Sequence, residues 1–310
     1  MRTYQSEEDY WRIREFLRRV MILNDCHERS WHVVRFDYWW WFANPTYEHF
    51  SLQEVVFIWE TDEGEIAAVL NPEAHTVAYL QIHPNFHTPE LVDEMIATAE
   101  KHLTETRQDG KRHLEFYIDS QDKLSHGALS RHGFQRVERP NENEIEHRRL
   151  LKDPLPELPV IPGYTIRPMG AGLELLERCY ASGLGFHNDD IQVARDNRDH
   201  PEWYHRIQSA PLYRRDLDIV AVAADGSIAA FCTAWFDDVS LTAYLEPVAT
   251  VAAHRKRGLG KAVVLEALYR LKQMGCKVAF VSGYSEGANA LYFSVMGPEH
   301  DISECWEKIF

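Results

Sequence analysis

A proline-rich segment divides the sequence into two nearly equal halves. Residues 152–163 include four prolines within nine positions, from Pro154 to Pro162. Proline has no backbone N–H and does not fit inside a helix, so this segment is expected to be an extended connector. The whole sequence has 310 residues, which fits two domains of about 150 residues. We therefore predict one domain over residues 1–151 and a second over residues 164–310.

Short fragments of the first half return in the second half. Gly64–Ala68 is similar to Gly226–Ala230, and Ala78–Leu80 is similar to Ala243–Leu245, at offsets of 162 to 165 residues. Each half also has the same order of expected elements: a helical part, two apolar strands around a turn, a third strand, an amphipathic helix, a fourth strand and a shorter helix. The sequence therefore predicts a duplicated α/β (α+β) unit, each copy with a mixed central sheet flanked by helices.

The second half shows its elements most clearly. Two β-rich runs, 217–224 and 228–235, flank the hairpin signal Asp225–Gly226, and a third strand is expected over 242–251. Apolar residues recur at helical spacing over 258–274, where Gly275 is expected to cap the helix. A buried strand over 277–282 and a short helix over 286–296 follow. The turn before the helix at 258–274 thus lies at a strand-to-helix junction.

The composition excludes several classes of protein. The net charge is −15, whereas binding to nucleic acid depends on Lys and Arg that neutralise phosphates; a cationic small molecule or an amine is the more natural ligand. No apolar run reaches about 18 residues and the first residues lack a signal-peptide core, so we expect a cytoplasmic protein with no membrane span. The five cysteines are scattered without a CxxC pair, which favours neither a disulfide framework nor a zinc site.

A basic turn precedes the helix expected over 258–274. It contains Arg255, Lys256, Arg257, Gly258, Leu259, Gly260 and Lys261. Glycine lets a ligand approach the backbone without obstruction by a Cβ, and the start of a helix offers unpaired N–H donors and a positive dipole. The turn is therefore suited to hold a pyrophosphate among its cationic side chains. A glycine-containing loop with a solvated basic patch is the alternative, because short glycine motifs often match by chance.

This turn resembles the [Q/R]-x-x-G-x-[G/A] loop of the GNAT family, the Gcn5-related N-acetyltransferases. The strand 245–250 and the segment 288–292 are similar to other landmarks of that family, and all three occur in the family's order. The resemblance covers residues 164–297 well and residues 1–150 only in element order and a few fragments. One departure is local: Tyr292 is followed by one residue more than the family's usual spacing, and then by Gly297–Pro298 instead of Gly-Phe. The resemblance implies two tandem GNAT-like domains.

The resemblance also implies an activity: direct transfer of an acetyl group from acetyl-CoA to an amine in a ternary complex, with no covalent enzyme intermediate and no metal. It assigns the backbone around Val248 and Thr250 to the pantetheine arm and the thioester carbonyl, and the turn to the pyrophosphate. Tyr292 matches the general acid, since a phenol with a pKa of about 10 is protonated at neutral pH. The residues implied to bind acetyl-CoA are Val248, Ala249, Thr250, Arg255, Lys256, Arg257, Gly258, Leu259, Gly260, Lys261 and Asn289.

Glu246 is the candidate for the group that takes a proton from the amine. Strand alternation places its side chain on the same face as Val248 and Thr250; a solvent-exposed glutamate on an edge strand is the alternative. Asn289 either contacts the pantetheine or caps its helix. For Tyr292, the alternative to a general acid is an aromatic side chain that only packs its helix against the core. His254 is either a phosphate ligand or a surface residue.

The first half keeps the architecture and loses the basic turn. Its counterpart, residues 81–91, has no glycine and no Lys or Arg, so we predict a degenerate GNAT-like domain that does not bind acetyl-CoA. His83 and His87 have a metal-like spacing, but Pro84 and Pro89 favour a loop without a metal. The aromatic run Trp39, Trp40 and Trp41 is expected to fill a core or the seam between lobes; the alternative is the wall of an acceptor pocket.

The acceptor stays open at this stage. The acids of the segment 186–190 would suit an ammonium group in the place where the family builds acceptor specificity; a solvated loop is the alternative. We expect a small-molecule amine, with the amine of an amino sugar or thiol glycoside as a second reading. A third reading is a sensor that binds acetyl-CoA without catalysis. The presence of Tyr292 and Glu246 argues against it, because a sensor needs no proton-transfer groups. A homodimer is left open.

Overall fold

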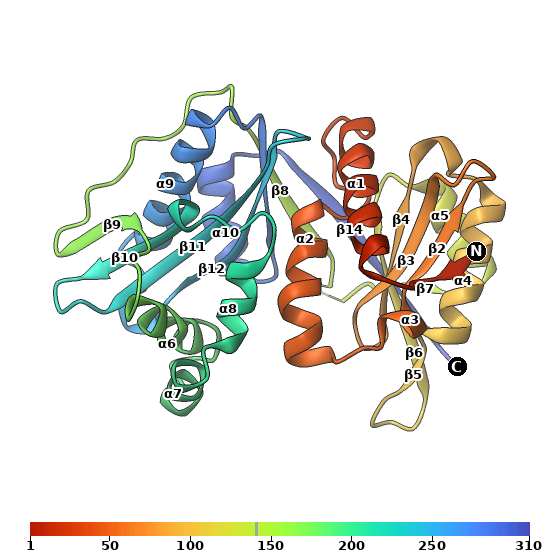
Figure 1. The fold of residues 1–310 in the computed structure, drawn as a ribbon, viewed down its shortest axis with the longest axis horizontal. Helices are drawn as coiled ribbons and strands as arrows, with labels where there is room; N and C mark the ends of the chain where they lie inside the picture. Colours follow the sequence, from red (N-terminus) through yellow and green to blue (C-terminus); the bar gives the residue numbers. More distant parts are fainter. Residues whose placement is uncertain (140–141) are drawn as a thin grey trace. The chain divides into compact units, whose positions relative to one another are not determined.

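The computed structural model describes residues 1–139 and 142–310 and divides into two compact units. The first unit comprises Met1–Glu146, Ser282–Glu286 and His300–Phe310, and the second comprises His147–Val281 and Gly287–Glu299. The last strand of the chain therefore belongs to the first unit (Figure 1). The sequence contains no signal for this return. The domain limits at residues 151 and 164 stay a prediction about the duplicated halves.

The first unit is built on a mixed sheet. Its strands, in spatial order, are β1 (Arg2–Thr3), β2 (Phe57–Glu60), β3 (Ile66–Ala74), β4 (Val77–Ile82), β6 (Arg112–Asp119) and β14 (His300–Ile309), with β5 (Glu105–Thr106) beside β6 and β7 (Gln135–Arg136) beside β14. Its helices are α1 (Glu7–Leu23), α2 (Val33–Tyr38), α3 (Leu52–Val55), α4 (Pro89–His102) and α5 (Lys123–Arg131), with the π-helical segment η1 (Trp39–Glu48) and the 3-10 turn η2 (Pro84–Phe86). Only β4 and β6 pair in parallel among the registers described.

Helices cover both faces of the first sheet. Apolar residues of α4 and α5, such as Met95, Ile96 and Leu129, pack with the strands in one buried cluster. On the opposite face α1 packs against α2 and β3. The Trp39–Trp41 run lies here: the ring of Trp40 is 4.6 Å from that of Tyr10, and Trp41 Nε1 donates a hydrogen bond of 2.8 Å to the Tyr10 hydroxyl. This aromatic run therefore contributes to packing inside the first unit.

The second unit repeats the same order of elements. Its strands are β8 (Glu144–Leu150, of which Glu144–Glu146 lie in the first unit), β9 (Tyr164–Pro168), β10 (Asp218–Ala223), β11 (Ile228–Asp237), β12 (Thr242–Thr250) and β13 (Val278–Gly283), in the spatial order β8-β13-β12-β11-β10-β9. Its helices are α6 (Glu174–Phe186), α7 (Ile191–Asp199), α8 (Glu202–Ser209), α9 (Leu259–Gln273) and α10 (Glu286–Met296), with short turns η3 (Arg215–Leu217) and η4 (Ala252–His254). The predicted succession of strands and helices is confirmed in both halves.

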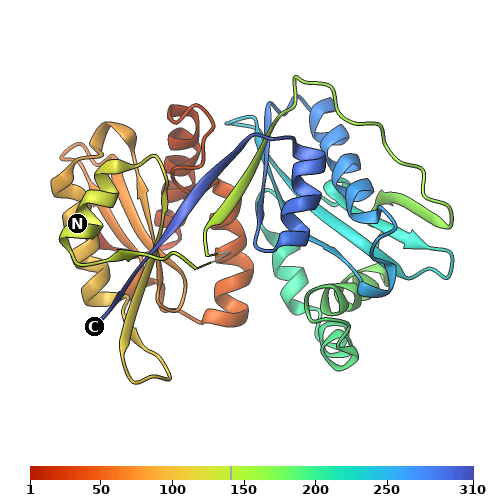
Figure 2. The ribbon, with the colours of Figure 1, turned by 180° about the vertical axis from the view of Figure 1, so that it is seen from behind.

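The core of the second unit lies between its sheet and α9. Leu245 and Cys232 of the strands pack with Val263, Leu268 and other residues of α9, and α10 adds Val295 to the same cluster. Figure 2 shows α9 and α10 in front of the strands of this unit. On the other face, α6 contacts β11 and β12.

Local turn signals explain why the predicted bounds agree with the observed ones. Gly64 and Gly226 occupy equivalent hairpin turns with φ of 82° and 88°, a conformation that favours glycine. Gly275, with φ of 86°, follows the end of α9, as predicted. The repeated fragments therefore mark repeated turns.

Candidate active site

The central feature of the second unit is an opening between two parallel strands. Within the described part of the chain, the pairing of β12 with β13 runs from Thr242–Val278 to Tyr244–Phe280 and ends there. On its other edge, β12 stays paired with β11 as far as Thr250. Val248, Ala249 and Thr250 are half-buried. The open edge of β12 is therefore accessible to an extended ligand that can pair with backbone groups.

A bulge interrupts β12 just before this edge. Leu245 stands opposite Ala234 and Val248 opposite Cys232, so two residues, Glu246 and Pro247, face the single Thr233. Leu245 and Val248 both pack against the α9 side of the sheet. The prediction that alternation puts Glu246 on the same face as Val248 and Thr250 is therefore wrong. A base role for half-buried Glu246 stays a prediction.

The open edge of β12 leads to the N-terminus of α9. Gly258 is the N-cap residue with φ of 84°, and no side chain caps this end in the part of the chain described. The first N–H groups of a helix have no intrahelical partner and sit at the positive end of its dipole. This helix end therefore offers donors to an anion, as the sequence predicted from the glycine turn.

The four cations of the turn divide into two kinds. Arg255 donates to the carbonyls of Thr250 at 3.1 Å and Gly185 at 3.2 Å, and Arg257 donates to the Tyr164 hydroxyl at 3.1 Å. His254 lies 2.9 Å from the same hydroxyl through Nδ1, which makes its role local. Lys256 and Lys261 make no hydrogen bond or ion pair with any residue that the structure describes.

Gly260 has a packing reason that the sequence did not reveal. A Cβ at this position would lie 3.1 Å from Leu291 Cδ2 and 3.2 Å from Thr250 Oγ1. Both distances are tighter than ordinary contacts, so the absence of a side chain lets α9 approach β12 and α10. The second glycine of the motif therefore serves packing as well as access to the backbone.

Tyr292 and Asn289 lie on α10 and share a neighbour that sequence reasoning missed. His147 of β8 is fully buried; its Nε2 lies 2.9 Å from Asn289 Oδ1, and its ring centre lies 5.5 Å from that of Tyr292. Tyr292 is 6% exposed and belongs to the core cluster. The three side chains form one cluster, and a lone histidine outside any recognised motif gave no signal for it.

The segment 186–190 uses its acids to hold backbone. Asp190 caps α7 by accepting from the N–H groups of Gln192 at 2.9 Å and Val193 at 3.2 Å. Asp189 Oδ1 accepts from the N–H of Ala252 at 3.1 Å, in the turn that leads to α9. These carboxylates therefore fix the loop, a function that the sequence analysis did not consider.

The equivalent helix of the first unit starts differently. Thr88 Oγ1 accepts from the N–H of Leu91 at 3.3 Å, and Pro89 supplies no N–H. His83 accepts from the N–H of Asn85 at 3.2 Å and His87 lies 3.2 Å from Ser125 Oγ, so each has a separate local partner. The start of α4 therefore offers fewer donors to an anion than the start of α9.

Comparisons with known proteins agree with this geometry. The profile of the acetyltransferase (GNAT) family matches residues 173–297, which include the glycine turn, the opened strand β12 and most of α10. The predicted resemblance to the GNAT family is therefore confirmed for this part of the chain. A comparison with curated protein sequences gives no significant match.

Solved structures resemble the whole chain. A GCN5-related N-acetyltransferase from Sphaerobacter thermophilus superposes with a TM-score of 0.64 at 17% identity, over 99% of this chain and 94% of that one. A tandem GNAT protein from the clavulanic acid biosynthesis pathway gives 0.60 at 12% identity, over 98% and 96%. A GNAT acetyltransferase from Colwellia psychrerythraea gives 0.60 at 12%, over 99% of both chains. At these identities the likeness establishes the fold, and the predicted tandem GNAT architecture is confirmed.

Proposed function

We propose that the second unit transfers an acetyl group from acetyl-CoA to the amine of a small molecule. The observation that carries the proposal is the uncapped N-terminus of α9 with the unpaired Lys256 and Lys261, next to the open edge of β12. A pyrophosphate needs both backbone donors and positive charge. An extended pantetheine arm needs a strand edge with free backbone groups. The second unit combines both.

The residues of this unit fit acetyl-CoA in a definite way. Lys256, Lys261 and the N–H groups from Leu259 onward would hold the phosphates, while Arg255 and Arg257 hold the turn in shape. The backbone of Val248, Ala249 and Thr250 would bind the pantetheine arm, and Asn289 would help to fix it. Acetyl-CoA would supply the acetyl group as a thioester. No metal ion is part of the proposal; the described residues contain no group of three or more metal-binding side chains.

Two proton movements fall to side chains of this chain. The hydroxyl of Tyr292 would give a proton to the departing sulfur, since a phenol is protonated at neutral pH. Glu246 would take a proton from the amine, directly or through a water molecule. The bulge interrupts the alternation of side chains along β12 at Glu246. The direction of the Glu246 side chain, and so its access to the amine, therefore depends on the geometry of the bulge.

Calorimetric titration with acetyl-CoA tests the proposal. The double substitution Lys256→Glu and Lys261→Glu should weaken binding at least tenfold, because it replaces two positive charges beside the phosphates with negative ones. The matched control is Lys101→Glu with Lys111→Glu, two exposed lysines of the first unit. We expect one acetyl-CoA per chain.

Three results would contradict parts of this proposal. Unchanged affinity in a folded Lys256 and Lys261 variant would remove the phosphate site. Two equivalent sites per chain would remove the degenerate reading of the first half. Binding of acetyl-CoA without release of free thiol, over a broad panel of amines, would favour a sensor over an enzyme.

A further inference from the structure

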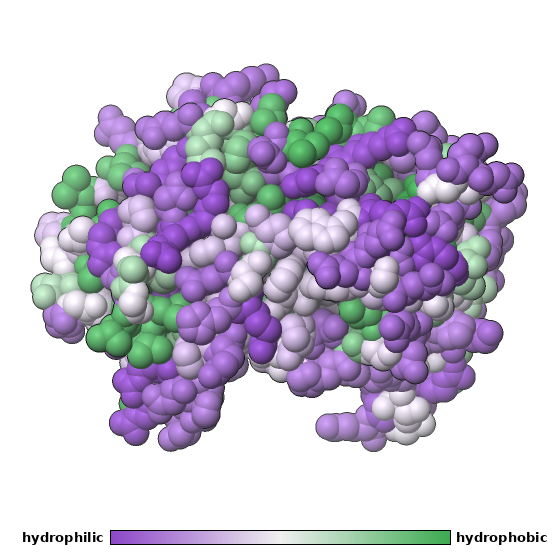
Figure 3. Space-filling model, in the orientation of Figure 1, coloured by the Kyte–Doolittle hydropathy of each residue, from purple (hydrophilic) through white to green (hydrophobic). Residues whose placement is uncertain are grey.

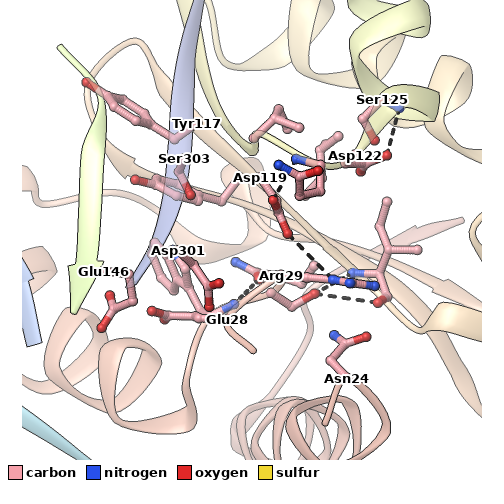
Figure 4. A pocket seen from close by; sticks show the side chains of 18 of the residues that line it. Asn24, Glu28, Arg29, Tyr117, Asp119, Asp122, Ser125, Glu146, Asp301 and Ser303 are labelled. Atoms are coloured by element: carbon pink, nitrogen blue, oxygen red, sulfur yellow. Dashed lines mark hydrogen bonds and ion pairs between the residues drawn. The ribbon is translucent and has the colours of Figure 1, made fainter. Parts of the chain in front are cut away.

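The first unit contains a cavity of about 410 Å³. Its position in the first sheet is equivalent to that of the opening between β12 and β13 in the second sheet. The described pairing of β4 with β6 covers Val77–Glu115 and Ala78–Phe116 only. Beyond it the cavity is lined by the loop that follows α1 and by residues of α2, β4, β6, α5, β8 and β14 (Figure 4). Its volume lies in the range of small-molecule sites, about 300–1,000 Å³. The duplicated unit has therefore kept an opening but changed what surrounds it.

Three buried glutamates line one part of this cavity. The side chain of Glu28 is 4% exposed, and Glu144 and Glu146 are 3% and 4% exposed. The carboxyl groups of Glu28 and Glu146 lie close enough together to affect each other's protonation. Ser282 Oγ lies 2.7 Å from Glu144 and 2.6 Å from Glu146, and its single proton can serve only one of these carboxyl groups at a time. Two carboxyl groups in contact need either a shared proton or a cation.

Among the residues that the structure describes, Arg35 is the cation that contacts these acids. Arg35 lies 3.0 Å from Glu144, 3.7 Å from Glu28 and 3.1 Å from Glu73, a further acid outside the cavity lining. Tyr79 and Tyr284 also donate to Glu144, at 3.4 and 2.8 Å, and add no charge. Burial, together with the neighbouring carboxylates, raises the pKa of Glu146 well above its ordinary value; burial raises that of Glu28. The cluster thus lacks positive charge.

Asn24 supplies an independent sign of a ligand. It closes the end of α1, is 8% exposed, and its side chain points into the cavity (Figure 4). Its carboxamide has no hydrogen-bond partner within residues 1–139 and 142–310. Its amide atoms are not among the fully enclosed unsatisfied atoms, so they are reached from the cavity and can hydrogen-bond to a ligand there.

The remaining lining includes aromatic side chains, two acids that have basic partners, and Lys123, which donates to the Ser120 carbonyl. The rings of Trp31 and Tyr79 are 4.9 Å apart, and those of Tyr79 and Tyr117 are stacked at 6.0 Å. Nearer the opening, Asp119 is 3.5 Å from Arg29, and Asp301 is 2.9 Å from His27. The carboxyl groups with the least compensating positive charge are therefore the glutamates, which lie beside an aromatic surface.

We propose that this cavity binds a small organic ammonium ion, with its charge at Glu28 and Glu146, its polar edge at Asn24 and its apolar body against Trp31, Tyr79 and Tyr117. Aromatic faces attract cations and cover apolar groups, which favours an organic cation over a bare metal ion. The acids would repel the pyrophosphate of a nucleotide cofactor. The site is independent of acetyl transfer in the second unit.

Calorimetry on the full chain with 2-phenylethylammonium chloride at pH 7.5 tests this inference. We expect saturable binding at the cavity, and none with 2-phenylethanol, which has the same aromatic body and no charge. Glu28→Gln should weaken binding at least tenfold, and so should Asn24→Leu, which fills the opening with an apolar side chain. The matched control is Glu138→Gln, whose side chain is 81% exposed.

Circular dichroism and thermal unfolding show that each variant is folded, and unchanged acetyl-CoA affinity separates this site from an amine site in the second unit. Equal binding of the alcohol and the ammonium ion would overturn the proposal. So would ammonium binding that is unchanged in both the Glu28 and Asn24 variants. Absence of binding, or displacement of the ammonium ion by Mg²⁺ at equal concentration, would overturn it as well.

Discussion

Tyr292 has a hydroxyl that we propose as the general acid and a ring that packs in the core. Its ring belongs to the core of the second unit and lies beside His147. Loss of the whole ring would leave a cavity, and its effect would mix stability with catalysis. Loss of the hydroxyl alone leaves the packing nearly unchanged. The hydroxyl can therefore be tested separately.

The substitution Tyr292→Phe should lower turnover by about 10²–10⁴-fold, the usual contribution of a positioned acid. Acetyl-CoA affinity should change little, since the phosphates and the pantetheine are assigned to other residues. The measurement is thiol release at saturating acetyl-CoA, once an acceptor is found. Tyr269→Phe is the control, because it removes a hydroxyl that donates to the Pro156 carbonyl on the same domain. Turnover at the wild-type rate would pass the role of acid to another group.

Single residues show where sequence reasoning reaches its limit. Lys256 and Lys261 could be selected from the sequence because they flank glycines in a recognisable turn. His147 and Asn24 could not, because their importance comes from neighbours far away in the chain or from the lack of one. Local patterns carry no record of such contacts.

At the scale of elements, the glycine turn and the helix after it form one unit of structure. Gly258 provides the left-handed conformation, and Gly260 lets α9 lie close to β12. A residue larger than glycine at 260 must push Leu291 or Thr250 aside. The geometry of the proposed phosphate site is therefore coupled to the packing of three elements.

Gly260→Ala tests this coupling. Overpacking costs about 1–3 kcal/mol, whereas alanine gains about 1 kcal/mol in a helix over glycine, so we expect a small net loss of stability together with weaker acetyl-CoA binding. Gly127→Ala is the matched control, since this helical glycine of α5 has its nearest contact at 3.6 Å; it should raise Tm. Equal gains of Tm in the two variants would show that a methyl group fits at position 260 without displacing Leu291 or Thr250.

Most helices and strands could be predicted from the sequence because characteristic turn residues mark their ends. The predicted helix over 258–274 is observed as Leu259–Gln273, and the predicted strand over 242–251 as Thr242–Thr250. The bulge in β12 was missed, although Pro247 inside a central strand was a signal, since proline cannot donate to a neighbouring strand. The pairing of β14 with β6 gave no such signal. Pairing between distant segments depends on three-dimensional packing.

For the whole molecule, charge is the property that the sequence described best. The net charge is −15, and hydrophilic residues cover most of the surface in the view of Figure 3. The two units differ in how they use charge: the second keeps unpaired lysines beside α9, and the first buries glutamates around one arginine. Duplication of one fold has thus given two openings of opposite electrostatic character.

The buried glutamates also make stability depend on pH. A carboxyl whose pKa is raised by folding keeps its proton longer in the folded state, so the stability it contributes is present below the ordinary glutamate value of 4.5 and is lost as pH rises through the folded-state pKa. Glu28, Glu144 and Ser282 act on Glu146 directly. Around Glu144, the neighbouring groups are Arg35, Tyr79 and Tyr284.

Glu146→Gln should therefore raise Tm at pH 8.5 and change it little at pH 5. The raised pKa favours the protonated carboxyl at pH 5, which is nearly isosteric with the amide, whereas rising pH favours a buried negative charge that the amide avoids. A gain of about 2 °C corresponds to roughly 1 kcal/mol for a chain of this size. Thermal unfolding at the two pH values measures the difference, with Glu138→Gln as the exposed control. A Tm change that is equal at both pH values would mean that Glu146 carries its charge throughout, balanced by Arg35 alone.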